Sequence, residues 1–351
     1  MNFNIKIIKA SKSKIDTIDF NNFSFGSVFT DHMFECDFID GKWLNPIIKP
    51  YQTISFEPSA SVFHYGQAIF EGMKAYKDKN DEVWLFRPDQ NFERINKSAV
   101  RMAIPEFPKE LFFEALTKLV DLEREWVKQG EGKSLYIRPF VIGNEYAIQA
   151  VPSKSYKFMI ICAPATLYYT KKLKVKVADK FSRAASGGVG YAKAAGNYAG
   201  QFYPTNLAKE EGFDQIIWTD SNEHNYLEEA GTMNIFFRIN DTLITAPTTD
   251  TILDGVTRKS IIQIAKDNGI SVEIKMLKIE ELKTAAKNGN LKEIFGAGTA
   301  AVVSEIKAFQ HKGDLYELET QDDSYAQRLK ANLVGIQTNE LGDPHNWRFK
   351  V

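Results

Sequence analysis

The pattern of apolar residues along this chain is interrupted once, between about Thr166 and Arg183. This stretch holds five lysines and shows little helical period. The chain has 351 residues, which is more than one hydrophobic core usually serves. We therefore predict a small α+β domain over residues 1–165, an interdomain linker over 166–183 and a larger domain over 184–351.

The first part of the chain alternates between strand and helix patterns. Residues 31–43 are strand-like and turn at Asp40-Gly41, and Pro88-Asp89 starts a helix whose apolar residues recur at spacings of three and four. The same reasoning predicts further elements: a strand at 82–86, a helix at 109–128, and strands at 136–143 and 156–163.

After the interruption the pattern starts again. Two strands, 214–219 and 233–239, are predicted to join through a turn at Ser221-Asn222. The remaining predictions are a helix at 257–267, a strand at 271–277, and a helix at 327–333 followed by an irregular tail.

Charge and composition exclude several functions. The chain has 44 basic and 45 acidic side chains, so it has no basic field for nucleic acid. The five histidines show no ligand spacing, so no metal site is predicted. The longest apolar run, Phe158 to Ala163, is far shorter than the ~20 residues of a membrane-spanning helix.

Cysteine usage indicates a reducing compartment. Cys36 and Cys162 are too few for a disulfide framework or a cysteine-ligated metal. Lysines interrupt the N-terminus, so there is no apolar signal-peptide core. We expect a cytoplasmic protein.

Residues 186–200 form the most unusual segment. They hold five of the 22 glycines and a single lysine, Lys193, among small or apolar residues. One interpretation is a flexible loop with a solvated lysine. The other is a lysine held without nearby charge in a tight backbone, where desolvation makes it a nucleophile or base of the kind that Schiff-base chemistry needs.

Two further segments have a similar double interpretation. Glu229 stands just before a glycine turn, where it is either a solvated carboxylate at a strand edge or a buried partner for a pyridinium nitrogen. Residues 254–259 open a helix with a glycine and a hydroxyl. This is either an ordinary capped start or a phosphate site built from backbone N–H groups.

A second small-residue loop lies at 295–301, and Arg94 supplies a positive charge on the early helix. One lysine, one carboxylate, two loops rich in backbone amides and one arginine together match the parts of pyridoxal phosphate.

With these segments in place, the chain resembles the branched-chain amino acid aminotransferases, a fold type IV pyridoxal phosphate family, over nearly its whole length. Eight segments match in the family's order: residues 29–33, 63–65, 70–76, 136–139, 187–198, 229–236, 255–258 and 296–303.

The resemblance implies a fold, an activity and an assembly. The fold is α+β, with a small domain and a larger pseudo-barrel domain, and the assembly is a homodimer whose loop 144–151 reaches the partner's site. The implied enzyme moves the amino group of L-leucine, L-isoleucine or L-valine to 2-oxoglutarate. It works reversibly through a ping-pong cycle on pyridoxal 5′-phosphate, and so would also catalyse the last step of branched-chain amino acid synthesis.

The resemblance also assigns roles to residues. Lys193 would be the Schiff-base lysine and Glu229 the partner of the ring nitrogen, while Tyr198 would bind the phenolic oxygen. The remaining assignments fall into two groups. The phosphate would be held by Arg94, Val256, Thr257 and Thr299. The substrate would be bound by Phe25, Tyr65, Phe70, Tyr136, Arg138 and Tyr168, and by the Thr299 and Ala300 amides.

Two kinds of alternative stay open. The first is another enzyme of the same fold, a D-amino acid aminotransferase or an aminodeoxychorismate lyase. The second is a catalytically inactive protein that keeps the fold and binds a phosphate ligand. Some relatives carry a redox Cys-x-x-Cys after the second small-residue loop. Here those positions are Ala301 and Ser304, so we expect no thiol regulation at that loop.

Overall fold

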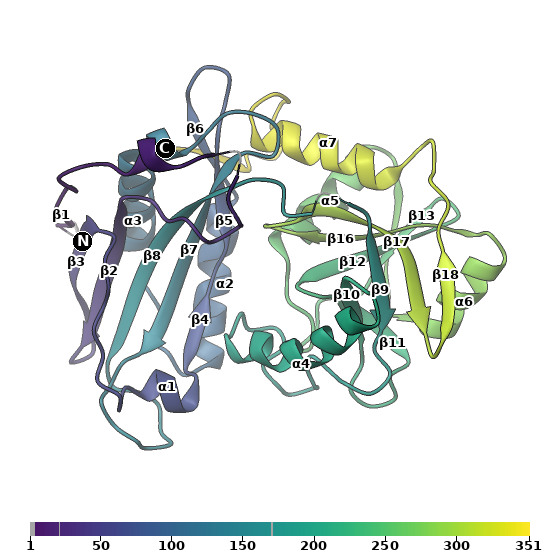
Figure 1. The fold of residues 1–351 in the computed structure, drawn as a ribbon, viewed down its shortest axis with the longest axis horizontal. Helices are drawn as coiled ribbons and strands as arrows, with labels where there is room; N and C mark the ends of the chain where they lie inside the picture. The colour runs from purple at the N-terminus through teal and green to yellow at the C-terminus, as the bar shows by residue number, and fades with distance from the viewer. Residues whose placement is uncertain (1–3, 21, 170) are drawn as a thin grey trace. The chain divides into compact units, whose positions relative to one another are not determined.

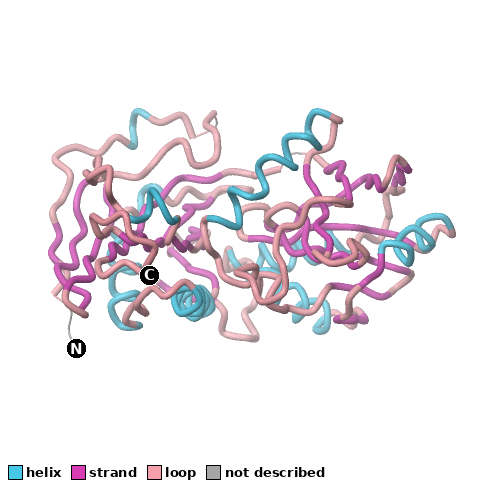
Figure 2. The backbone as a smooth tube through the Cα atoms, turned by 90° about the horizontal axis from the view of Figure 1, so that it is seen from below, coloured by secondary structure: helices cyan, strands magenta, loops and turns pink. Residues whose placement is uncertain are grey.

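The computed structural model describes residues 4–20, 22–169 and 171–351, and the chain divides into two compact units. Unit 1 comprises Met1–Tyr168, Ala192–Gly196 and Ile336–Val351. Unit 2 comprises Tyr169–Tyr191 and Asn197–Gly335. Helices, strands and the loops between them are marked along the backbone in Figure 2.

Unit 1 is built on one mixed sheet with helices packed against it (Figure 1). The strands follow the order β1-β3-β2-β8-β7-β5-β6-β19, and β4 pairs with β7 off this path. Their bounds are β1 Lys6–Ile7, β2 His32–Ile39, β3 Lys42–Pro50, β4 Ala68–Phe70, β5 Met73–Lys77, β6 Val83–Phe86, β7 Ser134–Gly143, β8 Tyr156–Ala165 and β19 Arg348–Lys350.

The helices of unit 1 are α1 Ser61–Tyr65, α2 Pro88–Arg101 and α3 Lys109–Leu122, with short 3₁₀ turns at Ile15–Thr17 and Arg124–Trp126. Pro88 begins α2 because proline needs no hydrogen-bond acceptor in the first turn. The apolar faces of α2 and α3 bury Ile95, Leu111 and Phe112 against the sheet, where Phe107 stacks on Phe158. This core fixes the strands on which the candidate residues of unit 1 lie.

Most of the local predictions for the first part are confirmed. The hairpin of β2 and β3 turns at Asp40-Gly41 as predicted, and the positive φ of both residues suits that turn. The prediction for α3 is too long, because the helix ends at Leu122 and a 3₁₀ turn follows.

Unit 2 contains a closed barrel (Figure 1). Its sheet follows the order β14-β13-β12-β16-β17-β9-β10-β11-β15, and an additional pairing of β11 with β12 closes the ring. The strands are β9 Leu173–Val177, β10 Gln215–Thr219, β11 Tyr226–Ala230, β12 Met233–Ile239, β13 Thr242–Thr245, β14 Ser271–Ile274, β15 Leu277–Lys278, β16 Leu291–Gly298, β17 Val302–His311 and β18 Asp314–Glu317.

The helices of unit 2 are α4 Gly196–Glu210, α5 Val256–Asp267, α6 Ile279–Lys287 and α7 Tyr325–Gln337. Barrel strands such as β12 and β16 are almost continuously apolar because both of their faces are buried. Ile235, Phe237, Ile294 and Phe309 belong to this core.

The range 166–183, predicted as a linker, contains β9, which pairs with β10 and β17 in the barrel. Its sequence, Leu-Lys-Val-Lys-Val, buries the apolar residues and leaves the two lysines half-buried. Two of the five lysines on which the linker prediction depended, Lys174 and Lys176, are the outward positions of a strand with period two. A strand at 226–230, β11, was also missed, and it lies between the two strands predicted to be adjacent.

The tail predicted to be irregular contains β19, which pairs with β6 in unit 1. Unit 1 is thus assembled from both ends of the chain and from residues 192–196 in its middle. Across residues 4–20, 22–169 and 171–351, none of the helices has the length and apolar character that a bilayer crossing requires.

Candidate active site

Lys193 lies on a short extended segment that runs along β4 in unit 1. The Phe70 N–H donates to the Lys193 carbonyl (3.0 Å), Ala194 bridges to Ile69, and the Ala195 N–H donates to the Ala68 carbonyl. The Lys193 N–H itself donates to the Ser98 Oγ at 2.9 Å. Its side chain is half-buried, and Nζ lies 4.9 Å from the centroid of the Phe70 ring. The backbone of the lysine is therefore fixed at both of its polar groups.

A charged pair lies next to this lysine. Glu71 is fully buried, and Arg94 on α2 binds it through Nε (2.6 Å) and Nη2 (2.9 Å). Asn91 and the Gly72 N–H also donate to the same carboxylate. Burial raises the pKa of Glu71, but Arg94, Lys193 and Asn91 outweigh it and hold the pKa below its ordinary value.

The prediction that Lys193 is held without nearby charge is therefore wrong. The Glu71 carboxylate is close enough to Lys193 for the positive charge of the lysine to lower the pKa of Glu71. Glu71 lies within residues 70–76, one of the segments that match the family, but the sequence predicts no role for it. The physical reason is that the pairing of Glu71 with Arg94 joins residues 23 positions apart, which no local pattern reports.

A group of aromatic side chains includes Phe70, the last residue of β4. Phe25 contacts Tyr136 edge-on at 5.0 Å and Tyr168 at 5.2 Å between ring centroids. The Arg138 guanidinium lies 4.5 Å from the Phe70 ring centroid and 5.3 Å from that of Tyr136. Unit 1 thus brings together five of the predicted substrate residues and Lys193.

Tyr65 has a different setting from these five residues. It ends α1, contacts the His64 ring and is 43% exposed.

Lys74 is not among the residues predicted from the sequence, yet it pairs directly with Tyr136 across β5 and β7 and so shares a face of the sheet with it. Burial lowers the pKa of Lys74 to about 8.

In unit 2, the carboxylate of Glu229 on β11 lies among N–H groups. Its Oε1 accepts from the Leu253 N–H (2.7 Å) and from Asn234 Nδ2 (3.0 Å). Its Oε2 lies 3.0 Å from Nε of Arg183, and both side chains are at most 6% exposed. These contacts favour an ionised carboxylate in a buried position.

Asn234 connects Glu229 with the start of α5. Its backbone pairs with Glu229 and Ala297, and its Nδ2 also donates to the Leu253 carbonyl. Gly255 precedes α5, and a Cβ there would overlap Asn234 Oδ1. Glycine is required at this position by close packing, because its φ of −68° suits any residue.

The first turn of α5 presents backbone donors that have no acceptor within the helix. Val256 and Thr257 are the first two helical residues, and both are buried. The first internal bond runs from the Lys259 N–H to the Gly255 carbonyl. Such a turn binds anions through its N–H groups and the helix dipole.

Thr299 and Ala300 lie in the turn between β16 and β17, close to the turn between β11 and β12. Gly298 pairs with Val302, and a Cβ at Gly298 would lie 3.5 Å from the Met233 side chain. Val302 has a φ of 59°, which a β-branched residue rarely adopts. Strain of this kind concentrates at functional turns. Tyr198 is half-buried in the first turns of α4.

The family model for amino-transferase class IV matches residues 68–309. A probable branched-chain-amino-acid aminotransferase of Staphylococcus epidermidis is 45% identical over 346 residues, covering 97% of this chain and 96% of the relative. The chain belongs to the branched-chain aminotransferase family of class IV. A branched-chain-amino-acid transaminase of Bacillus subtilis is 43% identical over 339 residues, covering 95% of each chain.

Solved structures share the fold of this aminotransferase. The branched-chain aminotransferase of the thermophilic archaeon Thermoproteus uzoniensis, solved with norvaline, matches with a TM-score of 0.74 at 24% identity. That match covers 91% of this chain and 99% of the other. The Escherichia coli enzyme matches with a TM-score of 0.72 at 24% identity, covering 91% and 98%. The predicted α+β architecture of fold type IV, with its pseudo-barrel, is confirmed.

The cofactor of this aminotransferase is pyridoxal 5′-phosphate, as in its class. The residues present fit that group. Lys193 supplies an amine, Glu229 a buried carboxylate, and the start of α5 an anion site next to it in the same unit. Unit 1 thus contributes the kind of amine that an aldehyde requires, and unit 2 the kind of carboxylate and backbone donors that a ring nitrogen and a phosphate require.

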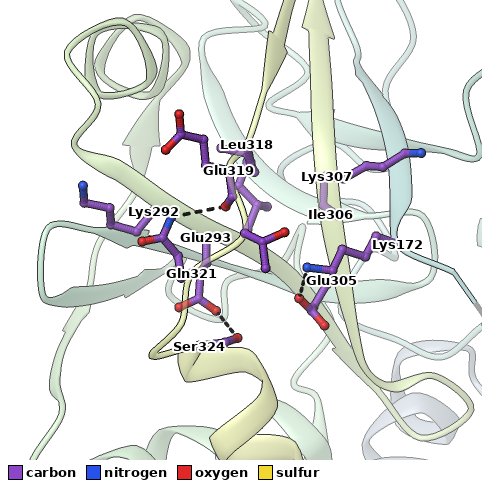
Figure 3. A pocket seen from close by; sticks show the side chains of 12 residues that line it. Lys172, Lys292, Glu293, Glu305, Ile306, Lys307, Leu318, Glu319, Gln321 and Ser324 are labelled. Carbon is purple, nitrogen blue, oxygen red and sulfur yellow. Dashed lines mark hydrogen bonds and ion pairs between the residues drawn. The ribbon is translucent and has the colours of Figure 1, made fainter.

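A cavity lies on unit 2, and Figure 3 shows its lining around Glu293 and Glu305. It holds about 380 Å³ of space open to solvent. Glu293 binds Ser324 (2.8 Å) and the Tyr325 N–H (2.8 Å) at the start of α7, and Arg238 Nη1 at 2.9 Å. These contacts give Glu293 the role of anchoring α7.

Proposed function

We propose that this aminotransferase moves the amino group of L-leucine, L-isoleucine or L-valine to 2-oxoglutarate in a reversible ping-pong reaction. The observation that carries the proposal lies in unit 1. There Lys193 Nζ lies 4.9 Å from the centroid of the Phe70 ring, next to an aromatic cluster that also contains Arg138. The names of its relatives support branched-chain amino acids as the amino donors.

When bound, pyridoxal 5′-phosphate supplies an electron sink for charge at the substrate Cα and carries the amino group between the two half-reactions. Lys193 would bind its aldehyde and would hold and move the proton at the substrate Cα as general acid and base. Glu229 would accept a hydrogen bond from the ring nitrogen, and Tyr198 would donate to the phenolic oxygen. Arg94, Thr299 and the Val256 and Thr257 amides would hold the phosphate.

Substrate choice follows from the side chains around the lysine. The rings of Phe25, Phe70, Tyr136 and Tyr168 bury an aliphatic side chain, which stabilises binding by about 0.8 kcal/mol per CH₂. Leucine, isoleucine and valine should therefore differ only modestly. Arg138 binds the second carboxylate of glutamate, and the Thr299 and Ala300 amides bind the α-carboxylate.

We include a homodimer in this proposal. Loop 144–151 joins α1 through the Ala60–Tyr146 bridge, and large apolar side chains on both segments are exposed: Phe63 (62%), Tyr65 (43%), Tyr146 (51%) and Ile148 (70%). An apolar patch of this kind marks a protein interface. The proposal also includes a cytoplasmic location, since Cys36 and Cys162 are both unpaired.

One spectrum tests the chemistry. We expect the purified protein to be yellow with pyridoxal 5′-phosphate, to lose this colour with L-leucine and to regain it with 2-oxoglutarate. Lys193→Ala should abolish both turnover and the colour change. Lys209→Ala, which removes an exposed lysine on α4, is the matched control and should behave like the wild type.

The alternatives predict different outcomes. A D-amino acid aminotransferase would respond to D-alanine and not to L-leucine, and an aminodeoxychorismate lyase would respond only to aminodeoxychorismate. A protein that binds the cofactor without reacting would stay yellow with all three substrates. A Lys193→Ala variant that transaminates at the wild-type rate would overturn the lysine assignment.

A further inference from the structure

Arg183 connects Glu229 to the glycine-rich segment of unit 2. Its Nε lies 3.0 Å from Glu229 Oε2. Its Nη2 donates to the Thr251 carbonyl and, at 3.2 Å, to the Gly190 carbonyl. The guanidinium is therefore fixed by backbone groups on two segments, so its position does not depend on Glu229.

A second buried carboxylate lies beside this pair. Glu228 precedes Glu229 on β11 and is 4% exposed. Thr251 Oγ1 donates to its Oε1 at 2.6 Å, while its Oε2 is buried without a hydrogen-bond partner. Burial and the charge on Glu229 raise the pKa of Glu228, although Thr251 and Arg183 oppose them.

The two carboxylates thus have unequal surroundings. Glu229 has three nitrogen neighbours, and Glu228 has one hydroxyl donor. Of two buried carboxylates, the one with fewer cationic and hydrogen-bonding partners takes up a proton more readily, and a neutral carboxyl cannot balance a protonated ring nitrogen. Arg183, whose Nε lies 3.0 Å from Glu229 Oε2, is a cation that favours charge on Glu229.

We propose that Arg183 is the positioning residue that holds Glu229 as an anion directed at the cofactor's ring nitrogen, and that Glu228 stays neutral in the same buried cluster. This rests on the role proposed above for Glu229. Other charged groups whose fields reach the cluster include Asp220, which acts on Glu228, and Arg258, which interacts with Glu229 and with Asp254.

The test uses Arg183→Gln, which removes the charge, and Arg183→Lys, which keeps it. For Arg183→Gln we expect the affinity for pyridoxal 5′-phosphate to fall by roughly 10- to 100-fold, the range typical when the partner that orients a site ligand is lost. The absorbance spectrum of the bound cofactor should also become pH-dependent where the wild-type spectrum is constant. Arg183→Lys should restore the constant spectrum.

A double-mutant cycle shows whether Arg183 acts through Glu229. In a Glu229→Gln background, Arg183→Gln should cause no further spectral change. A change of the same size in both backgrounds would overturn the proposal, and so would a wild-type spectrum and affinity in Arg183→Gln alone.

Two more variants separate this role from structural support. Arg238→Gln breaks another buried arginine–glutamate pair of unit 2, with Glu293 at 2.9 Å, and should lower stability without changing the spectrum. Glu228→Gln should also leave the spectrum unchanged, because Glu228 is already neutral. A spectral shift in Glu228→Gln would overturn the proposal even if Arg183→Gln does not fold. If the wild type itself binds no cofactor, the proposed function fails instead.

Discussion

At the scale of single residues, one glycine sets the position of the aromatic and arginine side chains beside Lys193. A Cβ at Gly72 would overlap the Tyr136 Oη and lie 2.9 Å from its Cζ. That hydroxyl accepts a hydrogen bond from Arg138 Nη2 at 3.0 Å. The missing side chain at Gly72 therefore lets Tyr136 stand where it orients Arg138.

We predict that Gly72→Ala changes substrate preference. Displacing Tyr136 should move Arg138 and raise the KM for 2-oxoglutarate by roughly 10-fold, which corresponds to about 1.4 kcal/mol. The KM for L-leucine should change less, because apolar contacts adapt more easily than a charged pair. Steady-state kinetics with each substrate measure the ratio. Gly342→Ala, in open space, is the control, and an equal loss for both substrates would count against this role.

At the scale of elements, the Glu71–Arg94 pair joins the β4–β5 connection to α2. Sequence patterns predicted α2 well, because its apolar spacing and Pro88 are local signals. They did not predict that Arg94 on this helix pairs with Glu71. The depressed pKa of Glu71 makes this contact a pH-dependent part of the fold's stability.

The pKa of Glu71 is lower in the folded protein than its ordinary value, and this direction determines how stability changes with pH. Folding favours the ionised form of Glu71, so its contribution is present above the ordinary pKa of 4.5 and is lost as pH falls through the lower folded value. We predict that Glu71→Gln lowers the free energy of unfolding by about 3 kcal/mol at neutral pH, because it leaves Arg94 buried without its partner.

Urea unfolding at neutral pH and at a pH below 4.5 measures this effect, and the difference from the wild type should shrink at the lower pH. Glu114→Gln is the matched control. It breaks a partly exposed pair with Lys118 on α3 and should cost less than about 1 kcal/mol. A loss for Glu71→Gln that does not depend on pH would contradict the assignment.

At the scale of the whole molecule, the two compact units are assembled from discontinuous segments. Lys193 reaches unit 1 from the middle of the chain, and β19 reaches it from the end. The exposed apolar patch of α1 and loop 144–151 belongs to this scale too, since only assembly would bury it.

We predict that Ile148→Glu weakens the proposed homodimer, because a charge placed at a 70% exposed apolar position would be buried unpaired in an interface. Sedimentation velocity should show the wild type as a dimer and the variant shifted to monomer. Val100→Glu, at a 64% exposed position on α2, should stay dimeric. A monomeric wild type would remove the homodimer from the proposal.

The sequence by itself determined the family and most of the local elements. It could do so because helix starts, apolar periods and motif spacings are short-range properties that the chain carries wherever it folds. Lys193, Glu229 and the start of α5 are predicted as cofactor residues from the sequence, through the resemblance to the family.

Only the tertiary structure decided which side chains surround those residues. Arg183 and Glu229 are 46 positions apart, and Glu71 pairs with Arg94 on a different element. The barrel strand β9 and the terminal strand β19 likewise depend on partners far along the chain. Buried ion pairs and strand pairings form between distant residues, so their energy lies in contacts that no local pattern records.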